Sequence, residues 1–330
     1  MDMFKYVVKR ILLAVMCFVI ITSMCFILIR IYENVYLASK MESLTLAQAE
    51  AMLARRSAMG MDKPIFVQLA IFFKNMVLEG NIGISMYLKP NYPVAEIIQS
   101  RLLPTVLVNV YSLVIAVPLG FVLGIYAALK KNKWQDNLIS TAVMLFISVP
   151  SYVYAFLMQY FVFSIGRAEG MLVVQDAVVV GGYFNAAMLK SQILPVLALS
   201  FGSIAGYARY TRAELTESLT QDYMLLARTK GLKRRQAITR HAMKNAMVPI
   251  LPMIIGEFIG VLGGSMVIEN IFGIQGMGKL YIQAYSMFDC DVFVAVGMFY
   301  TVISLLAGIL VDLSYGFIDP RIRMGSGKNG

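Results

Sequence analysis

Few side chains in this sequence have the type and spacing needed for chemistry. His241 is the only histidine, and no serine and acid accompany it in the pattern of a nucleophilic triad. The cysteines Cys17, Cys25 and Cys290 are too few and too scattered for a disulfide framework or a metal site. The sequence also lacks a Gly-x-x-x-x-Gly-Lys-Ser/Thr loop, which would bind phosphate. We therefore expect no enzymatic activity and no cofactor bound by this chain.

The most polar stretch of the chain covers residues 209–245, and apolar segments of membrane-spanning length lie on both sides of it. It holds nine of the 29 Lys and Arg residues. A connecting loop this basic belongs on the cytoplasmic side of a membrane, because Lys and Arg resist translocation. Residues 214–230 contain no proline and precede Gly231, a pattern that predicts a helix, a glycine break and a second helix. Such a hairpin is a candidate docking surface for a partner protein.

The overall composition indicates a polytopic membrane protein. Hydrophobic residues make up 59% of the chain and charged residues only 15%, with a mean hydropathy of +0.71. Soluble domains carry about 25% charged residues. The net charge of +10 flanks the apolar segments rather than forming one basic domain. It therefore indicates membrane topology and not a nucleic-acid partner.

Six apolar segments have the length and composition of transmembrane helices, and the first is predicted to be an uncleaved helix rather than a signal peptide. They cover residues 11–29, 104–129, 138–165, 192–208, 247–268 and 292–317. Pro150 predicts a kink in the third segment. The Lys and Arg residues of the short connections predict that both termini face the cytoplasm.

These elements divide the chain into four predicted regions. Residues 1–30 form an N-terminal transmembrane helix, and residues 31–103 form an external segment. Within that segment, spaced apolar positions at 45–59 predict a short amphipathic helix. Residues 104–318 form a core of five transmembrane helices that includes the cytoplasmic loop 209–246, and residues 319–330 form a cytoplasmic tail. The predicted fold class is all-α.

Short motifs in a fixed order carry a resemblance to a known family. They are Val8-Lys9-Arg10-Ile11, Gly80-Asn81-Ile82-Gly83-Ile84-Ser85, Arg101-Leu102-Leu103-Pro104-Thr105, Ser148-Val149-Pro150-Ser151-Tyr152, Arg209-Tyr210-Thr211-Arg212, Gln221-Asp222-Tyr223, Ala227-Arg228-Thr229-Lys230-Gly231-Leu232, Arg240-His241-Ala242, Glu269-Asn270-Ile271-Phe272 and Asp319-Pro320-Arg321-Ile322-Arg323. Together they resemble the B-type permease subunit of bacterial ABC importers for dipeptides, oligopeptides and nickel. The chain departs from the family at Leu225-Leu226-Ala227, where relatives have Glu-Ala-Ala.

The resemblance implies a type I ABC importer permease in the bacterial cytoplasmic membrane. In this family two similar permeases pair, and each presents a coupling helix to one of two ATP-binding subunits, which hold ATP and Mg. An extracellular or periplasmic binding protein delivers the substrate. The coupling helix precedes the glycine break, and the residues implied at its docking surface are Asp222, Ala227, Arg228, Lys230 and Gly231.

Three sets of residues keep a second interpretation. Ala227 and Gly231 either allow a partner's backbone to approach closely or are an ordinary helix end with its glycine cap. The basic run Lys233-Arg234-Arg235 either supports docking or holds the loop at anionic membrane lipid. Glu257 is an acid within the glycine-rich fifth segment, and intramembrane acids face a cavity or a partner because lipid exposure is costly. It either lines the substrate path, near a peptide's amino group, or makes a structural contact to another helix. Asp312, near the inner end of the sixth segment, is expected to form a structural ion pair.

Two other classes of function compete with an ATP-driven peptide importer. An ion-coupled secondary transporter would carry several intramembrane charges, and Glu257 stands nearly alone. A membrane scaffold would need only the basic loop and not motifs along the full chain. Within the importer class peptides are favoured over nickel, because one histidine and no Cys or Met cluster offer little to a soft metal. A chelated metal would not need such ligands, so nickel and other small solutes stay as alternatives.

Overall fold

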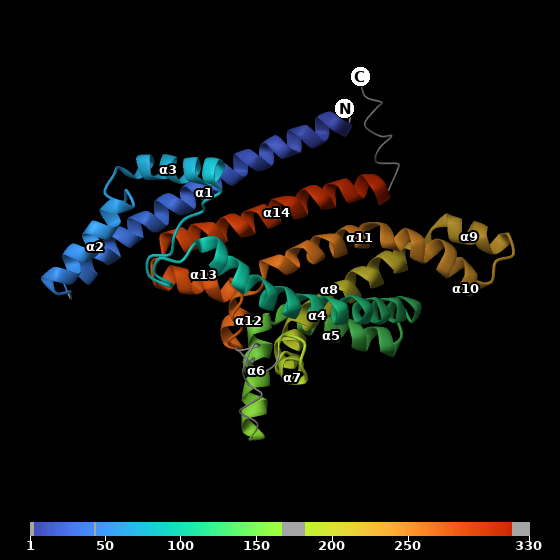
Figure 1. Ribbon diagram of the computed structural model, residues 1–330. Coiled ribbons are helices and arrows are strands. Elements are labelled where there is room, and N and C mark those ends of the chain that lie inside the picture. The colour runs from blue at the N-terminus through green and yellow to red at the C-terminus, as the bar shows by residue number, and fades with distance from the viewer. Residues whose placement is uncertain (1–2, 43, 167–181, 319–330) are drawn as a thin grey trace. The chain divides into compact units, whose positions relative to one another are not determined.

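The computed structural model describes residues 3–42, 44–166 and 182–318, and its regular elements there are helices (Figure 1). They are α1 (Met3–Met41), α2 (Leu46–Ala58), α3 (Ile65–Glu79), α4 (Val94–Leu129), α5 (Trp134–Ser148), α6 (Ser151–Ser164), α7 (Ala186–Ser191), α8 (Ile193–Thr220), α9 (Asp222–Thr229), α10 (Arg234–Ala237), α11 (Met243–Gly260), α12 (Met266–Ile271), α13 (Met277–Ser286) and α14 (Cys290–Ile318). A π-helical turn, Ile238–Ala242, joins α10 to α11. The all-α prediction is confirmed. The predicted tail 319–330 lies outside the described residues.

The apolar helices agree with a polytopic membrane protein. Within the described ranges, five helical segments are long and apolar enough to cross a membrane: Val7–Ala38, Val94–Leu129, Ile193–Thr220, Arg234–Ile271 and Cys290–Ser314. The pair α5 and α6 makes a sixth crossing if it counts as one span. Two helices run further than their apolar stretches. Helix α1 continues past Arg30 to Met41, and α8 continues past Ala208 to Thr220.

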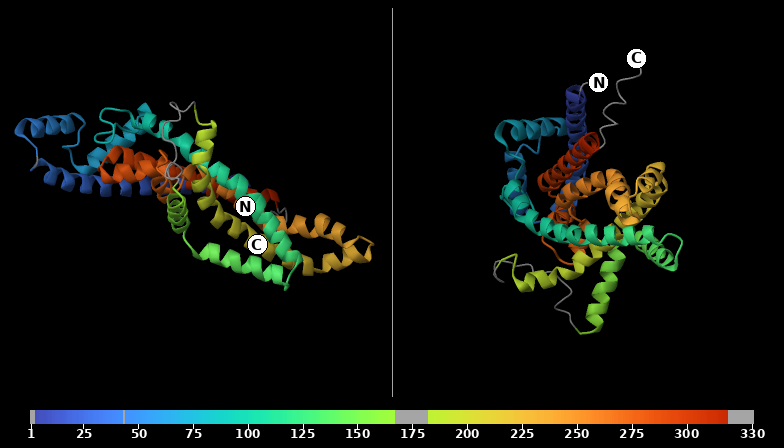
Figure 2. Two further views of the ribbon diagram at one scale, coloured as in Figure 1. Left: turned by 90° about the horizontal axis from the view of Figure 1, so that it is seen from below. Right: turned by 90° about the vertical axis from the view of Figure 1, so that its right-hand side faces the viewer.

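The third predicted span is broken rather than kinked. Helices α5 and α6 meet at an angle of 96°, and Figure 2 shows them leaving the break in different directions. Val149 is extended, with φ −97° and ψ 123°, and Pro150 follows it as the N-cap of α6. Proline disfavours a helical residue before it and has no N–H to donate to the preceding turn. The sequence located this break correctly and underestimated its angle.

The helices form two compact units. The larger unit comprises Pro104–Ile274 and the part of α14 from Leu306 on. The smaller unit comprises the chain up to Leu103 and Gln275–Leu305. Each unit has buried apolar clusters of its own, such as the one around Ile268 and Phe272 in the larger unit and the one around Leu280 and Val296 in the smaller unit.

Helix α8 is the central element of the larger unit. It packs against α11, α5 and α6. Two glycines one turn apart on α4 let the same helix approach closely on another side. A Cβ atom at Gly120 would lie 2.5 Å from the Cβ of Tyr207, and one at Gly124 would lie 2.6 Å from the Cβ of Thr211. Glycines at this spacing allow such close helix contact in lipid.

Sequence motifs far apart in the chain also meet within the larger unit. Thr105 Oγ1 donates to Glu269 Oε1 at 2.8 Å, and both residues are buried. Gly264 has φ +66°, and a Cβ there would lie 2.7 Å from Thr105 Cγ2. Only glycine suits this position, because L-residues are strained at such a φ and the side chain has no room. The motif around Thr105 in α4 is therefore bonded to the motif in α12.

We predict that Gly124→Ala destabilises the chain and that Gly206→Ala does not. The added methyl group at Gly124 would also lie 2.7 Å from the backbone oxygen of Ala208, which cannot move without shifting α8. Overpacking of this kind costs about 1–3 kcal/mol. At Gly206 on α8 a methyl group meets nothing within 4 Å. Thermal unfolding in detergent measures both, and equal midpoints for the two variants would contradict the close contact.

Candidate functional site

The 209–246 loop folds as a helical hairpin with one more break than its sequence predicts. Instead of one helix over 214–230, α8 ends at Thr220 and α9 begins at Asp222. Gln221 between them is extended, with ψ 151°. Ser218 donates from Oγ to the backbone oxygen of Ala242 at 2.9 Å and also bonds the hydroxyl of Tyr223. These contacts stabilise the turn, although no proline or glycine marks it.

One face of α9 belongs to the hairpin's own core. Met224 and Ala227 are buried against residues from α8, α10, the π-helical turn and α11. That set is Leu215, Ala237, Ile238, Ala242 and Ala246. Ala227 is only 6% exposed. Its small side chain therefore packs within the chain, and its predicted part in docking stays a prediction.

Gly231 ends α9 in the conformation that glycine favours. Its φ is +84°, and its N–H donates to the oxygen of Arg228 at 3.0 Å. The N–H of Leu232 donates to the oxygen of Ala227 at 3.2 Å, and Leu232 packs on the hairpin core. This pair of bonds is a Schellman motif with its hydrophobic contact. A Cβ at Gly231 would meet nothing within 4 Å, so the backbone angle alone requires glycine.

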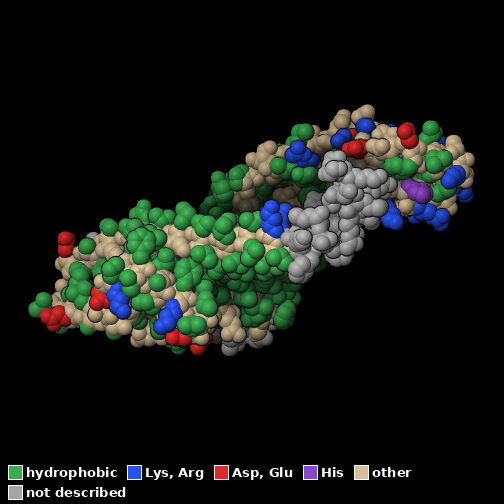
Figure 3. Space-filling model, turned by 90° about the horizontal axis from the view of Figure 1, so that it is seen from above, with side chains coloured by type: hydrophobic (Ala, Val, Ile, Leu, Met, Phe, Trp, Pro, Cys, Tyr) green, Lys and Arg blue, Asp and Glu red, His purple; other side chains and the backbone are tan. Residues whose placement is uncertain are grey.

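The opposite face of α9 presents two leucines. Leu225 is 66% exposed and Leu226 is 56% exposed. The predicted docking residues Asp222, Arg228 and Lys230 are exposed around them. Lys and Arg side chains gather over this hairpin in Figure 3. The leucines were not predicted as site residues, although their departure from Glu-Ala-Ala was the signal that marked them.

A second candidate region lies in the larger unit beside Glu257. Its carboxylate accepts a hydrogen bond from Ser203 Oγ at 2.6 Å, and the hydroxyl of Tyr207 donates to its other oxygen. A cavity of about 210 Å³ adjoins these groups. The residues that line it are Asn109, Ser112, Leu113, Leu199, Ser203, Glu257, Gly260 and Val261. The carboxylate thus faces an open space and also bonds a neighbouring helix.

The polar half of α8 is held to α5 by an ion pair. Arg212 Nη2 donates to Asp136 Oδ2 at 2.8 Å. Asp136 is almost fully buried, and its carboxylate also accepts from the backbone N–H of Asn132 at 2.9 Å. The segment of α8 that leads into α9 is therefore held against α5.

Asp312 was expected to form a structural ion pair. It interacts within the described chain, whereas Arg321 and Arg323, which lie beyond it in sequence, are outside the described residues.

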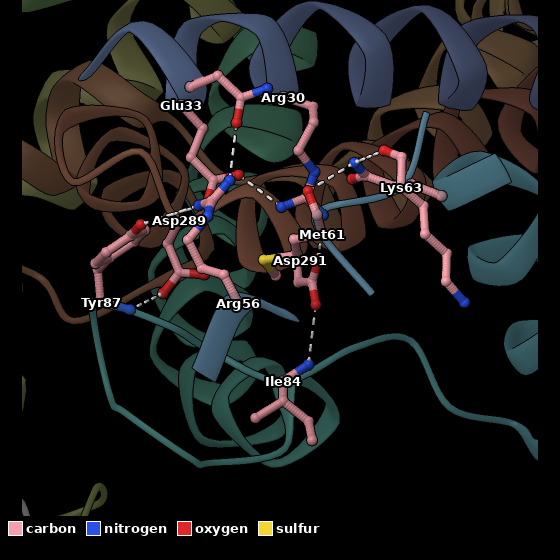
Figure 4. Close-up of polar contacts among 11 residues, drawn as sticks. Arg30, Glu33, Arg56, Met61, Lys63, Ile84, Tyr87, Asp289 and Asp291 are labelled. Carbon is pink, nitrogen blue, oxygen red and sulfur yellow. Dashed lines mark hydrogen bonds and ion pairs between the residues drawn. The ribbon is translucent and has the colours of Figure 1, made fainter. Parts of the chain in front are cut away.

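A network of buried charges forms in the smaller unit (Figure 4). Glu33 in α1 is fully buried and accepts from two arginines, Arg30 Nη1 at 2.6 Å and Arg56 Nη1 at 2.5 Å. Arg30 also pairs with Asp291 of α14 at 3.3 Å. Neither the continuation of α1 past Arg30 nor this network was predicted, because the sequence does not place Arg56 and Asp291 beside the end of an apolar run.

The Gly80-Asn81-Ile82-Gly83-Ile84-Ser85 motif is the loop that docks onto this network. Ile84 N–H donates to Asp291 Oδ2 at 3.2 Å, and Ser85 Oγ donates to Asp289 Oδ2 at 2.6 Å. Gly83 has φ +110°, and a Cβ there would lie 2.6 Å from Asp291 Oδ2. The structure thus explains the glycine of this motif. Gly83 leaves room for the carboxylate of Asp291, which accepts a hydrogen bond from the backbone of the same loop.

Tyr87 completes the network from the end of the same loop. Its hydroxyl donates to Glu33 Oε1 at 3.4 Å. Burial and the negative charge of Glu33 raise the pKa of Tyr87 to about 12. The phenol therefore stays neutral at physiological pH. A cavity of about 460 Å³ lies beside the network, with Arg30, Gln68 and Asp291 among its lining residues.

Among the described residues there is no group of three or more His, Cys, Asp and Glu side chains with the geometry to hold a metal ion. The geometry instead offers a docking surface on α9, a carboxylate beside a cavity in the larger unit, and a buried charge network in the smaller unit.

Comparison with known proteins gives matches along nearly the whole chain. Residues 120–324 match the family described as binding-protein-dependent transport system inner membrane component. Residues 3–108 match the N-terminal region of binding-protein-dependent transport system membrane components. A glutathione transport system permease protein, GsiC from Escherichia coli K12, is 32% identical over 97% of this chain and 99% of its own length. The dipeptide transport system permease protein DppB from Lactococcus lactis is 31% identical over 98% of this chain and 100% of its own length.

We predict that Glu33→Gln destabilises the smaller unit, whereas Glu50→Gln leaves it unchanged. Removing the carboxylate leaves the guanidinium groups of Arg30 and Arg56 buried without their shared anion, and breaking a buried pair in this way costs about 3–5 kcal/mol. Glu50 is exposed on α2 and serves as the matched control. Limited proteolysis of the purified chain, with sites mapped to residues 31–93, reads out the loss. Equal protection of the two variants would contradict a stabilising network.

Proposed function

Because the chain belongs to the family of binding-protein-dependent transport system inner membrane components, as a B-type permease of the peptide and nickel group, we propose that it moves peptides across the cytoplasmic membrane by ATP-driven alternating access. The family consists of permease subunits without a catalytic site of their own.

Peptides are the favoured substrate class. Two similar full-length proteins are named for transport of glutathione and of dipeptides, and both substrates are small peptides. The match covers nearly all of this chain and nearly all of each relative, so it includes the helices that would surround a substrate. Delivery by an external binding protein follows from the family description.

Coupling to ATP is proposed to occur at α9. The observation that carries it is the exposure of Leu225 and Leu226 on a short helix whose other face is packed into the hairpin core. Apolar side chains held outward on a rigid element suit a partner groove. Asp222, Arg228 and Lys230 supply charges at the rim, which favour orientation more than affinity. Ala227 and Gly231 contribute from within, by fixing the shape of α9.

The partners in this proposal are those that membership of the family implies. The two ATP-binding subunits hold ATP and Mg, a second homologous permease completes the path, and a binding protein brings the peptide from outside. Both termini and the 209–246 loop face the cytoplasm, where the ATP-binding subunits are, and Lys233, Arg234 and Arg235 lie at the lipid surface. Closure of the ATP-binding subunits moves α9 in this proposal.

Movement at α9 would reach the membrane through α8. This helix is continuous from Ile193 to Thr220 and ends one residue before α9. Along it, Arg212 is paired with Asp136, and Tyr207 bonds Glu257. A displacement of the hairpin therefore acts on the ion pair first and on the Glu257 cavity next. Glu257 is proposed to line the substrate path.

We predict that Leu226→Asp releases the ATP-binding subunits without unfolding the permease. The substitution places a charge where the docking groove would be apolar, and it leaves the buried face of α9 unchanged. Affinity-tagged protein is solubilised from host membranes, and co-purified chains are counted by mass spectrometry. Recovery of ATP-binding chains should fall at least tenfold, which corresponds to about 1.4 kcal/mol.

Asn137→Asp is the matched control, since it adds the same charge to an exposed position in the first turn of α5. It should retain the ATP-binding chains at the wild-type level. If wild-type protein recovers no ATP-binding chains and no second permease, the importer assignment fails, and an ion-coupled transporter becomes the better explanation. If Leu226→Asp recovers them fully, docking occurs elsewhere.

A further inference from the structure

We propose that Glu257 binds the positively charged amino group of a peptide as it passes through the cavity between α4, α8 and α11. This inference rests on the proposed function and adds a site and a ligand chemistry to it. The observation behind it is a carboxylate inside a membrane-spanning segment that adjoins a cavity and has only neutral partners.

The partners of Glu257, which is half-buried, distinguish it from two fully buried acids of this chain, Glu33 and Asp136. Glu33 is neutralised by two arginines, and Asp136 is neutralised by Arg212. For Glu257 the contacts are the hydroxyl groups of Ser203 and Tyr207, and within the described chain no Lys or Arg side chain lies within 4.0 Å of it. Its charge is thus oriented by the protein but is not compensated by it.

An ammonium group fits what this carboxylate still offers. A carboxylate has two oxygens with about four acceptor positions, and the hydroxyls of Ser203 and Tyr207 occupy two of them. The hydroxyls hold the group in one orientation, so a passing cation meets an acceptor that is already placed. A charge-assisted bond between an ammonium and a carboxylate is stronger than a neutral one.

The cavity has the size and lining for the end of a peptide. Its volume of about 210 Å³ is below the range of roughly 300–1,000 Å³ typical of drug-sized ligands, so it suits one terminal residue and not a whole oligopeptide. Asn109, Ser112 and Ser203 provide polar lining, and Leu113, Leu199 and Val261 provide apolar lining. Gly260 also lines the cavity, and a Cβ atom added there would meet nothing within 4 Å. The space next to Gly260 is therefore open.

The competing explanation is that Glu257 only ties α11 to α8 through its two hydrogen bonds. That role needs an acceptor and not a charge, so it should survive Glu257→Gln. A cation site needs the charge, so it should be lost in Glu257→Gln and retained in part in Glu257→Asp. The difference between these variants is therefore the test.

The first experiment measures the charge in the cavity directly. In full-length protein in host membranes, Cys17→Ser, Cys25→Ser and Cys290→Ala remove the native thiols, and Leu199→Cys places one in the cavity lining. Two thiol reagents of opposite charge are then compared, a cationic trimethylammonioethyl methanethiosulfonate and an anionic sulfonatoethyl methanethiosulfonate. The measured quantity is the rate at which each reagent modifies the introduced cysteine. We expect Glu257→Gln to lower the ratio of cation to anion rates about tenfold, as a nearby unit charge would. Asn137→Cys is the control, and its ratio should not change.

The second experiment measures transport. Uptake of a dipeptide with a free amino terminus should show a KM raised about tenfold in Glu257→Gln, with Glu257→Asp closer to wild type. An unchanged rate ratio, or an unchanged KM, overturns the proposal and leaves Glu257 a structural residue. Failure of the importer assignment looks different, because wild-type protein would then recruit no ATP-binding chains and take up no peptide, while the thiol ratio would still report on Glu257.

Discussion

Two acids that this chain buries completely among its helices, Glu33 and Asp136, are paired with arginines, and the fold depends on these ion pairs. An isolated ion in a medium of low dielectric constant is too costly to keep, whereas a pair with good geometry is tolerated. Glu33 meets this constraint by joining α1 to α2 through Arg56, and Arg30 extends the contact to α14 through Asp291. Asp136 meets it by joining α5 to α8 through Arg212. The buried charges therefore connect elements that apolar packing alone would leave free to slide.

The same reasoning explains why α8 is the element on which the larger unit is built. Glycines on α4 receive it at Tyr207 and Thr211, and the ion pair to α5 fixes its polar end. Neither contact depends on lipid, which is as apolar as the side chains and so provides little force between helices. Close packing and paired polar groups supply that force instead. These contacts lie on the part of α8 between the α9 hairpin and the Glu257 cavity.

Much of this architecture was predictable because its cause is local. A transmembrane helix satisfies its backbone within itself, so hydropathy identified the spans, and Pro150 marked the break in the third. The angle of that break was not predictable, since packing in three dimensions sets it. Arg30 looked like the end of a helix because its partners Arg56 and Asp291 are distant in sequence. The turn at Gln221 was missed because Ser218 and Ala242, rather than glycine or proline, stabilise it.

At the α9 hairpin, too, some features were predictable from the sequence and others were not. The resemblance implied a coupling segment, but nothing in the sequence showed which face of α9 is buried. Ala227 was therefore included among the docking residues, and the exposed Leu225 and Leu226 were not. Their exposure has an energetic consequence. Two fully buried leucines contribute roughly 3–6 kcal/mol, and association costs roughly 4–15 kcal/mol in lost freedom. One α9 helix is therefore too small to hold an ATP-binding subunit by itself. In the proposed assembly two permeases present two such helices to two ATP-binding subunits. Once these subunits are paired with each other, the second docking event is intramolecular and far less costly. The small apolar face of α9 thus favours a paired complex over a single docked chain.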